Sequence, residues 1–134
     1  MEFTLINDAS QDLTVTHVTV TLGDSSVDEL HDEDGGIGRG VSEVHVDADV
    51  KDGVCDVSGS GSLPRTFDLA TDGWSDDADA VAVLSAGSSG SFAPSRFEAG
   101  GTPVDMVGQT VDVDLDFEFD GGTTGSASFT LNPE

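Results

Sequence analysis

The chain has 134 residues, and its 27 acidic and 4 basic side chains leave a formal net charge of −23. Its length suits one domain, residues 1–134, with its own hydrophobic core. This charge excludes a basic stripe for binding nucleic acid, and no run approaches the ~18 apolar residues of a membrane-spanning helix.

So dense a like charge destabilises a compact state in dilute buffer, although it keeps the chain soluble. In molar salt the Debye length falls to about 3 Å, and the repulsion between carboxylates becomes tolerable. The composition is rich in aspartate, has Lys51 as its one lysine, and is similar to that of haloarchaeal proteins. We therefore expect a protein that works in concentrated brine, where its carboxylates bind sodium, potassium or calcium with low affinity.

The N-terminal region predicts two β-strands. Phe3 and Leu5 share one face of the first, and residues 7–10 form the turn that follows it. The apolar positions of the next strand change phase near Thr16 and His17. Because strand side chains alternate between two faces, this change predicts a β-bulge, or a strand that bends from one sheet to the other.

A hairpin is predicted after a long loop over residues 23–40. Val44–Lys51 alternates, and Asp52-Gly53 is a strong type I′ turn signal. A two-residue turn pairs, on one face, Val50 with Cys55 and Ala48 with Val57. Cys55 is therefore expected inside as a small hydrophobe, and as the single cysteine it forms no internal disulfide.

The middle of the chain predicts less regular structure. Weaker strands are expected at residues 65–70 and 80–85, and residues 71–79, which contain Trp74, are expected to form a turn or a short helical piece. Residues 86–107 are predicted as the second long loop. No helix of three turns is predicted anywhere.

The clearest strand lies near the C-terminus, where residues 111–120 alternate apolar and acidic side chains. The odd positions face a core and the even positions face solvent. A three-residue loop, Gly121–Thr123, is expected to pair Phe117 with Ala127 and Leu115 with Phe129. Seven to eight such strands predict an all-β fold, an antiparallel β-sandwich of the immunoglobulin-like or jelly-roll-like kind.

One acidic segment is a candidate for cation binding. Asp32-Glu33-Asp34 is similar to the start of a calcium loop, but the fifth and sixth positions are Gly36 and Ile37, where an EF-hand needs a ligand and a glycine. A looser cation site is left open, with the following candidate ligands: Asp32, Asp34 and Glu43.

Other catalytic and metal patterns are missing from the sequence. The three histidines are too far apart for a local motif, and His45 and Cys55 are predicted on opposite faces, so they cannot share a zinc ion. The glycine-rich residues 35–40 lack the lysine of a phosphate loop. With 27 acids, carboxylate pairs occur by chance. We expect no cofactor and no enzymatic activity.

Several segments together resemble a known family. Phe3–Asn7 followed by Leu13–Val20, and Phe97–Gly101 followed by Met106–Val111 and Phe119–Gly122, are similar to strands of haloarchaeal pilin-like β-sandwich domains. The likeness covers about half of the chain and implies a sandwich with a role in a surface filament. Pilins polymerise through an N-terminal hydrophobic helix, which this sequence does not show.

These observations predict a non-catalytic structural subunit that packs against copies of itself or against other structural proteins. We expect a virion component of a haloarchaeal virus, such as a capsid decoration, turret or tail protein, because the sequence starts with methionine and shows no signal peptide. One alternative is a pilin-like or surface-filament domain lacking its anchor, on the cell exterior. Another is a module that binds a small ligand or cation.

Aromatic side chains supply the candidate contacts with a partner, because aromatics dominate interface energetics. The candidates are Trp74, Phe92 and Phe97, which lie in or beside the predicted loops. The alternative for each is a place at the edge of the core.

Overall fold

The computed structural model describes residues 1–24, 26–31, 44–48, 56–57, 61–69, 73–74, 82–94 and 96–134, with the backbone alone at 56–57 and 73–74. Among these residues the chain forms thirteen strands and no helix. The strands are β1 (Phe3–Ile6), β2 (Leu13–Leu22), β3 (Glu29–Leu30), β4 (Val44–Asp47), β5 (Asp56–Val57), β6 (Arg65–Asp68), β7 (Gly73–Trp74), β8 (Ala82–Leu84), β9 (Ser89–Pro94), β10 (Phe97–Ala99), β11 (Thr102–Pro103), β12 (Val111–Phe119) and β13 (Thr124–Leu131). Seven of them have four or more residues, namely β1, β2, β4, β6, β9, β12 and β13.

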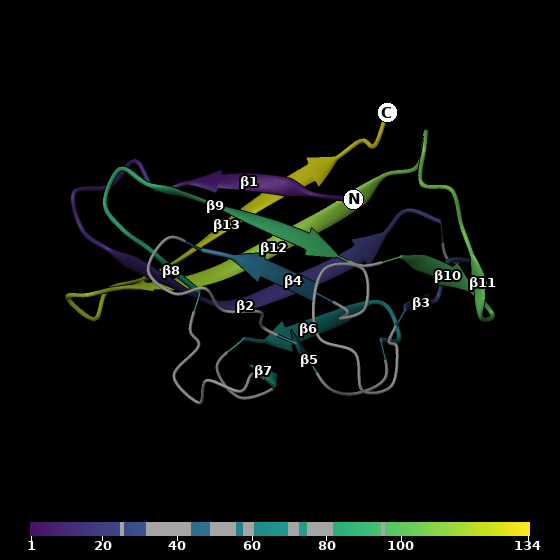
Figure 1. Ribbon diagram of the computed structural model, residues 1–134, viewed down its shortest axis with the longest axis horizontal. Helices are drawn as coiled ribbons and strands as arrows, with labels where there is room; N and C mark the ends of the chain where they lie inside the picture. Colours follow the sequence, from purple (N-terminus) through teal and green to yellow (C-terminus); the bar gives the residue numbers. More distant parts are fainter. Residues whose placement is uncertain are drawn as a thin grey trace.

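Two antiparallel sheets make up the body of the molecule (Figure 1). The larger has the order β13-β12-β2-β6, with β8 also paired to β2, and the smaller has the order β1-β9-β4. The strands of the smaller sheet cross over β13, β12 and β2, and the core lies between the two layers. The predicted all-β sandwich is therefore confirmed. Two small sheets, β11-β10-β3 and β5-β7, complete the described strands.

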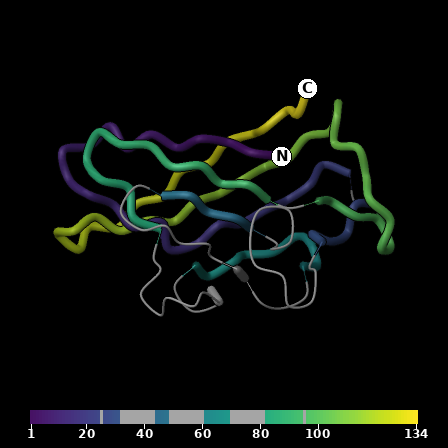
Figure 2. Tube along the Cα trace, viewed as in Figure 1, coloured from purple at the N-terminus to yellow at the C-terminus, as the bar shows by residue number. Residues whose placement is uncertain are grey.

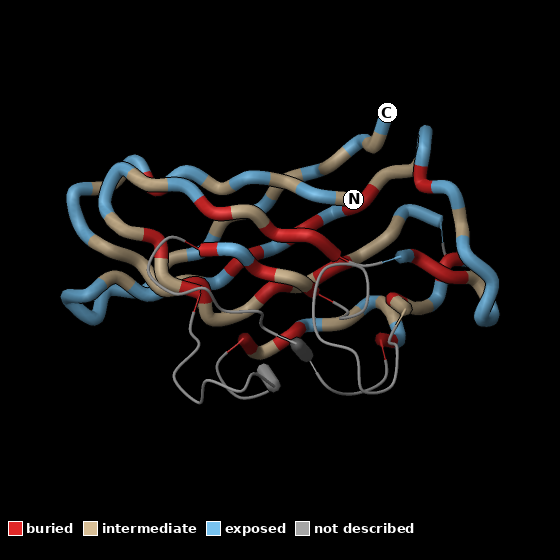
Figure 3. The backbone as a smooth tube through the Cα atoms, viewed as in Figure 1, coloured by how far each residue is buried: buried red, intermediate tan, exposed pale blue. Residues whose placement is uncertain are grey.

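The alternation of β12 sets the orientation of the core. Val111, Val113 and Leu115 are at most 2% exposed, whereas the acidic residues between them are exposed. From the other layer Val46 and Phe92 are equally buried. Figure 3 shows buried stretches in both layers. An antiparallel sheet with one face on the core and the other in solvent requires this division of faces. The prediction for β12 is confirmed.

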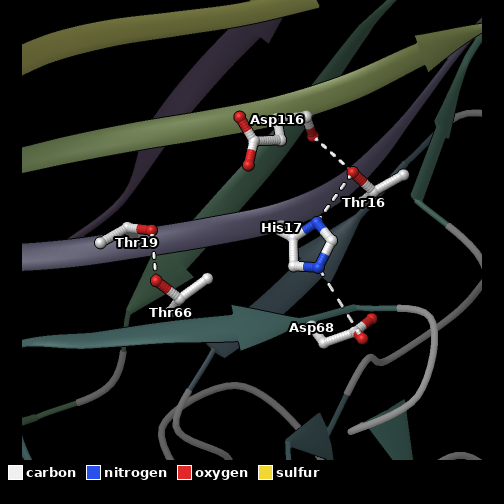
Figure 4. Close-up of polar contacts among 6 residues, drawn as sticks. All are labelled: Thr16, His17, Thr19, Thr66, Asp68 and Asp116. Atoms are coloured by element: carbon white, nitrogen blue, oxygen red, sulfur yellow. Dashed lines mark hydrogen bonds and ion pairs between the residues drawn. The ribbon is translucent and has the colours of Figure 1, made fainter. Parts of the chain in front are cut away.

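The predicted phase change in β2 is a β-bulge. Asp116 of β12 pairs with His17, but the next residue, Phe117, pairs with Val15, so Thr16 is the extra residue. The bulge lets Val15 and Val18 both point into the core although their numbers differ in parity. The Thr16 hydroxyl donates a hydrogen bond of 3.1 Å to the carbonyl of Asp116 (Figure 4).

The expectation of one long loop over residues 86–107 is wrong. Ser89–Pro94 forms β9, the central strand of the smaller sheet, and β10 and β11 follow it. Glycine, serine and proline disfavour strands locally, so the pairing of β9 with β1 and β4 carries it into the sheet. Gly90 allows the close approach, because a Cβ there would lie 2.5 Å from Leu84 Cδ2 and 3.0 Å from the Asp47 carbonyl oxygen.

The predicted register of the C-terminal hairpin is wrong by two residues. Phe117 pairs with Gly125 and Leu115 with Ala127. The loop has three residues, but they are Asp120–Gly122, and Gly122 has a φ of 81°. That conformation closes the turn and suits glycine. The inward face is unchanged, because a shift of two preserves the side on which each residue points.

The remaining strand predictions have mixed outcomes. The expected strands at 65–70 and 80–85 are confirmed as β6 and β8. The hairpin around Asp52-Gly53, with Cys55, falls on residues 49–55, outside the described part of the chain, and stays a prediction. In the described part, β4 pairs with β9, and β5 pairs with β7.

The two ends of the chain lie at the same end of the sandwich (Figure 2). Met1 and Pro133 line one shallow hollow there, together with Phe97 and Val104. The β12–β13 hairpin loop lies at the opposite end.

Gly61 tests the close packing beneath β3. Its amide carbonyl accepts a hydrogen bond from the Leu30 amide at 2.7 Å, and a Cβ on Gly61 would clash with the Leu30 carbonyl oxygen. We expect Gly61→Ala to lower the free energy of unfolding by about 1–3 kcal/mol, as overpacking does, measured by denaturant unfolding in high salt. Gly23→Ala is the control, because its Cβ would meet Thr110 at an ordinary 3.8 Å. Equal effects of both substitutions would contradict the expectation.

Candidate functional site: the open edge of the sandwich

The structure places two of the predicted contact aromatics in the core. Phe92 is 0% exposed and Phe97 is 2% exposed. Phe92 stacks on Phe3 with ring centroids 5.7 Å apart. A side chain enclosed on all sides cannot contact a partner, so the alternative of a core position holds for both. Trp74 lies on β7, and its side chain is outside the described part of the structure.

The predicted cation ligands Asp32, Asp34 and Glu43 lie outside the described residues, and the proposed cation site stays a prediction. Among the residues that are described, no three His, Cys, Asp or Glu side chains come together as a metal-binding group. The carboxyl of Asp24 accepts a hydrogen bond from the Ser26 amide, which holds the pKa of Asp24 below its ordinary value. This is a local turn contact.

The histidines occupy separate places. His17 on β2 lies 3.8 Å from the Asp68 carboxylate on β6, and its Nδ1 lies 3.0 Å from the Thr16 hydroxyl (Figure 4). Since that hydroxyl gives its hydrogen to the Asp116 carbonyl, Nδ1 must donate to it. His31 pairs with Glu98 at 2.9 Å near the small β11-β10-β3 sheet.

An apolar groove opens where the two main sheets end on the same side. β1 is the edge of the smaller sheet, β13 is the edge of the larger one, and the two lie next to each other (Figure 1). Between them the structure has a groove of about 260 Å³. Its lining includes Leu5, Ile6, Phe117, Phe119, Ala127 and Phe129.

The groove exists because the sandwich is incompletely closed along this edge. Phe3 and Phe129 approach across the two layers with ring centroids 6.3 Å apart. Toward the β12–β13 loop no further strand covers the core face in the described structure, and Phe117 and Phe119 are only half-buried. Ile6, at 67% exposed, stands at the rim. Apolar surface therefore reaches solvent at this edge of a chain with charge −23.

Asn7 holds one wall of the groove in place. It is 2% exposed, and its side-chain amide donates to the carbonyls of Gln11 and Leu84 at 2.9 Å each. Its Oδ1 accepts from the Ala9 amide at 3.0 Å. A buried polar side chain needs such partners, so Asn7 ties the β1–β2 turn to the end of β8. Its position after a short apolar strand is the sequence signal of a turn, but its long-range partner could not be read there.

Electrostatics distinguish the strands beside the groove. On the outer face of β12, Asp112, Asp114, Asp116 and Glu118 are all exposed. β13 next to it carries no charged side chain, and its outer positions are serine and threonine. Sequence reasoning missed this surface, although the uncharged stretch from residue 121 to residue 133 is visible in the sequence.

Comparison of the chain with protein-family models, with curated proteins and with solved structures found no match. Within the described residues, no helix is long and apolar enough to cross a membrane.

Substitution of Phe92 tests whether this side chain stabilises the core. We expect Phe92→Ala to lower the free energy of unfolding by about 3–5 kcal/mol, because it leaves a cavity in the core. Thermal and denaturant unfolding in high salt measure the change. Ile6→Ala is the control, since Ile6 is exposed on the paired strand β1, and it should change stability by no more than about 0.5 kcal/mol. A Phe92→Ala protein of unchanged stability would contradict the core position.

Proposed function

We propose that the chain is a non-catalytic structural subunit of a multi-subunit assembly that works at high salt. The observation that carries the proposal is the open edge of the sandwich, where an apolar groove lies between two edge strands. Exposed apolar surface of this kind marks a surface that meets another molecule. Edge strands with free backbone groups do the same.

The charge distribution supports the high-salt part of the proposal. The exposed carboxylates of β12 follow one another along a single face. Neighbours two residues apart on a strand are separated by about 7 Å, and two charges at that distance repel by about 0.6 kcal/mol in water. Such rows are tolerable where salt screens them.

Two forms of assembly agree with this proposal. The virion component predicted from the sequence is one, and the pilin-like or surface-filament domain is the other. Immunogold labelling in the organism that encodes the chain would separate them, because the label would decorate either virus particles or cell-surface filaments. Label confined to the cell interior, on no particle or filament, would oppose both.

Neutralising part of the acidic row tests the adaptation to salt. We expect Asp114→Asn/Asp116→Asn to raise the free energy of unfolding by about 1 kcal/mol in dilute buffer, because it removes neighbouring repulsions. The gain should vanish in ~3 M KCl, where the Debye length is below about 3 Å. Unfolding curves of both proteins in both salts give the measurement. A gain that is the same in the two salts would argue against screening as the reason for this composition.

Substitution at the rim of the groove tests the assembly role. We expect the wild-type chain in ~3 M KCl to form species larger than a monomer, alone or with its partner subunits, by light scattering. Ile6→Asp should reduce these species at least about 10-fold, because it places a charge against an apolar contact surface. Val107→Asp is the control, as Val107 is similarly exposed (61%) but lies away from the groove. A strictly monomeric wild type with every candidate partner would refute the proposal.

A further inference from the structure

We infer that β13 is the seam of a two-fold symmetric pair, in which it binds β13 of a second copy of this chain in antiparallel orientation. The inference rests on the proposed assembly role and deepens it, because it names the surface and the partner. Three independent features of β13 support it: a free backbone edge, the lack of charge on that edge, and the symmetry of its outer side chains.

The free edge follows from the hydrogen-bond pattern of the hairpin. Within the described structure β13 pairs only with β12. The Phe119 amide donates to the Thr123 carbonyl at 2.8 Å, so Phe119 and Thr123 form a hydrogen-bonded pair. Hydrogen-bonded and non-hydrogen-bonded pairs alternate in an antiparallel ladder. The residues of β13 that turn their backbone N–H and C=O groups away from β12 are therefore Thr124, Ser126, Ser128 and Thr130.

The edge also lacks the usual protection against pairing. Edge strands are normally short or carry charged side chains that discourage contact with another strand. The other described edge strands of the two main sheets follow this rule: β4 contains Asp47, β6 contains Arg65 and Asp68, and β1 and β8 have four and three residues. β13 has eight residues and no charge. In a chain with 27 acids, a second acidic chain that approaches this edge meets no carboxylate on the strand itself.

The order of the side chains along β13 indicates that the partner is a second copy of this chain. Four side chains on the outer face of β13 are exposed: Thr124, Ser126, Ser128 and Thr130. Their order, Thr-Ser-Ser-Thr, is the same when it is read from either end of the strand. An antiparallel pair centred on Ala127 places Ser126 opposite Ser128 of the second copy, and Thr124 opposite Thr130. A two-fold interface requires this reciprocity, in which residue i meets j and j meets i.

The same register matches the backbone. In this register, the residues whose backbone N–H and C=O groups face away from β12 are paired with one another. Every such backbone group within the paired segment therefore meets a hydrogen-bond partner. On the inner face it places Phe129 of one copy opposite Gly125 of the other. Gly125 has no side chain, and the Phe117 ring of the same chain occupies the space where its Cβ would be. An aromatic side chain would thus arrive beside a half-buried aromatic ring that lines the groove.

The pairing also keeps the acidic rows apart. The two β12 strands would be separated by two β13 strands, which is about 14 Å at the spacing of neighbouring strands. That distance exceeds the Debye length of about 8 Å at physiological ionic strength and is several times the length in molar salt. The repulsion between the two β12 faces is therefore largely screened.

Proline substitution tests the seam without disturbing the fold. Ser128→Pro removes an N–H that faces the free edge, and proline is tolerated at such positions of an edge strand. We expect the dissociation constant of the dimer to rise about 10–100-fold in ~3 M KCl, measured by sedimentation, because each copy loses a hydrogen bond at the seam. The melting temperature of the monomer should change little.

The matched control is Thr4→Pro. The Asn7 amide donates to the Ser88 carbonyl, so by alternation Thr4 turns its N–H to the free edge of β1. The dimer should persist in this variant. Dissociation by Thr4→Pro, or a dimer unaffected by Ser128→Pro, would overturn the inference.

Disulfide trapping tests the register. Ala127 lies at the centre of the proposed pair, at a non-hydrogen-bonded position where the two Cα atoms are about 4.5 Å apart, within reach of a disulfide. In a Cys55→Ser background, Ala127→Cys should cross-link into dimers under mild oxidation. Ser126→Cys, one residue away, should do so at least about 10-fold more slowly, because residue 126 faces 128. Equal rates would refute this register.

The outcomes also separate this inference from the proposed function. A wild-type chain that is monomeric by itself but enters larger particles with other subunits would overturn the β13 seam and leave the assembly role standing. A chain that joins no particle and forms no dimer would overturn both.

Discussion

The alternation of apolar and acidic side chains along β12 is the constraint on which the rest of the structure depends. β12 pairs with β2 on one side and β13 on the other, so its two faces set the two faces of the larger sheet. Val111, Val113 and Leu115 supply the core, and the acidic residues between them can face only solvent. A chain with charge −23 can bury a continuous core because a period of two separates the charge from it.

The same separation determines where the molecule can meet another molecule. The outer face of β12 repels an acidic partner, and most of the core between the sheets is covered. Among the described residues, a long uncharged surface lies along β13 and in the groove beside it, where Phe117 and Phe129 are half-buried. The proposed assembly role and the proposed seam both follow from this one distribution of charge. Their common physical basis is that association is least costly where no carboxylate must lose water or approach another carboxylate.

The alternation of side chains along a single strand was enough to predict some features of the fold. The inward face of β12 and the bulge at Thr16 could be read from parity alone, because each is a property of one strand. The register of the β12–β13 hairpin could not be read in this way, since a shift of the pairing by two residues leaves the inward face unchanged. The turn with Gly122 in the left-handed conformation selects one of these registers. β9 was missed because its residues favour loops and its two neighbours lie far away in sequence. Phe92 was a candidate contact because it falls in the segment expected to be a loop, and the structure shows the alternative, a core position.

The candidate site was predictable in a different sense. No motif marks it, because backbone groups and the absence of charge do not form a residue pattern of the kind that signals a catalyst or a metal. Yet the sequence does contain the contrast in charge that marks the site: an uncharged final strand follows a strand with alternating acidic residues. In molar salt, hydrogen bonds and apolar contacts persist while long-range repulsion is screened. A protein built in this way needs no basic residues for recognition, because a long edge strand without charge already differs from the shorter or charged edges of the described main sheets.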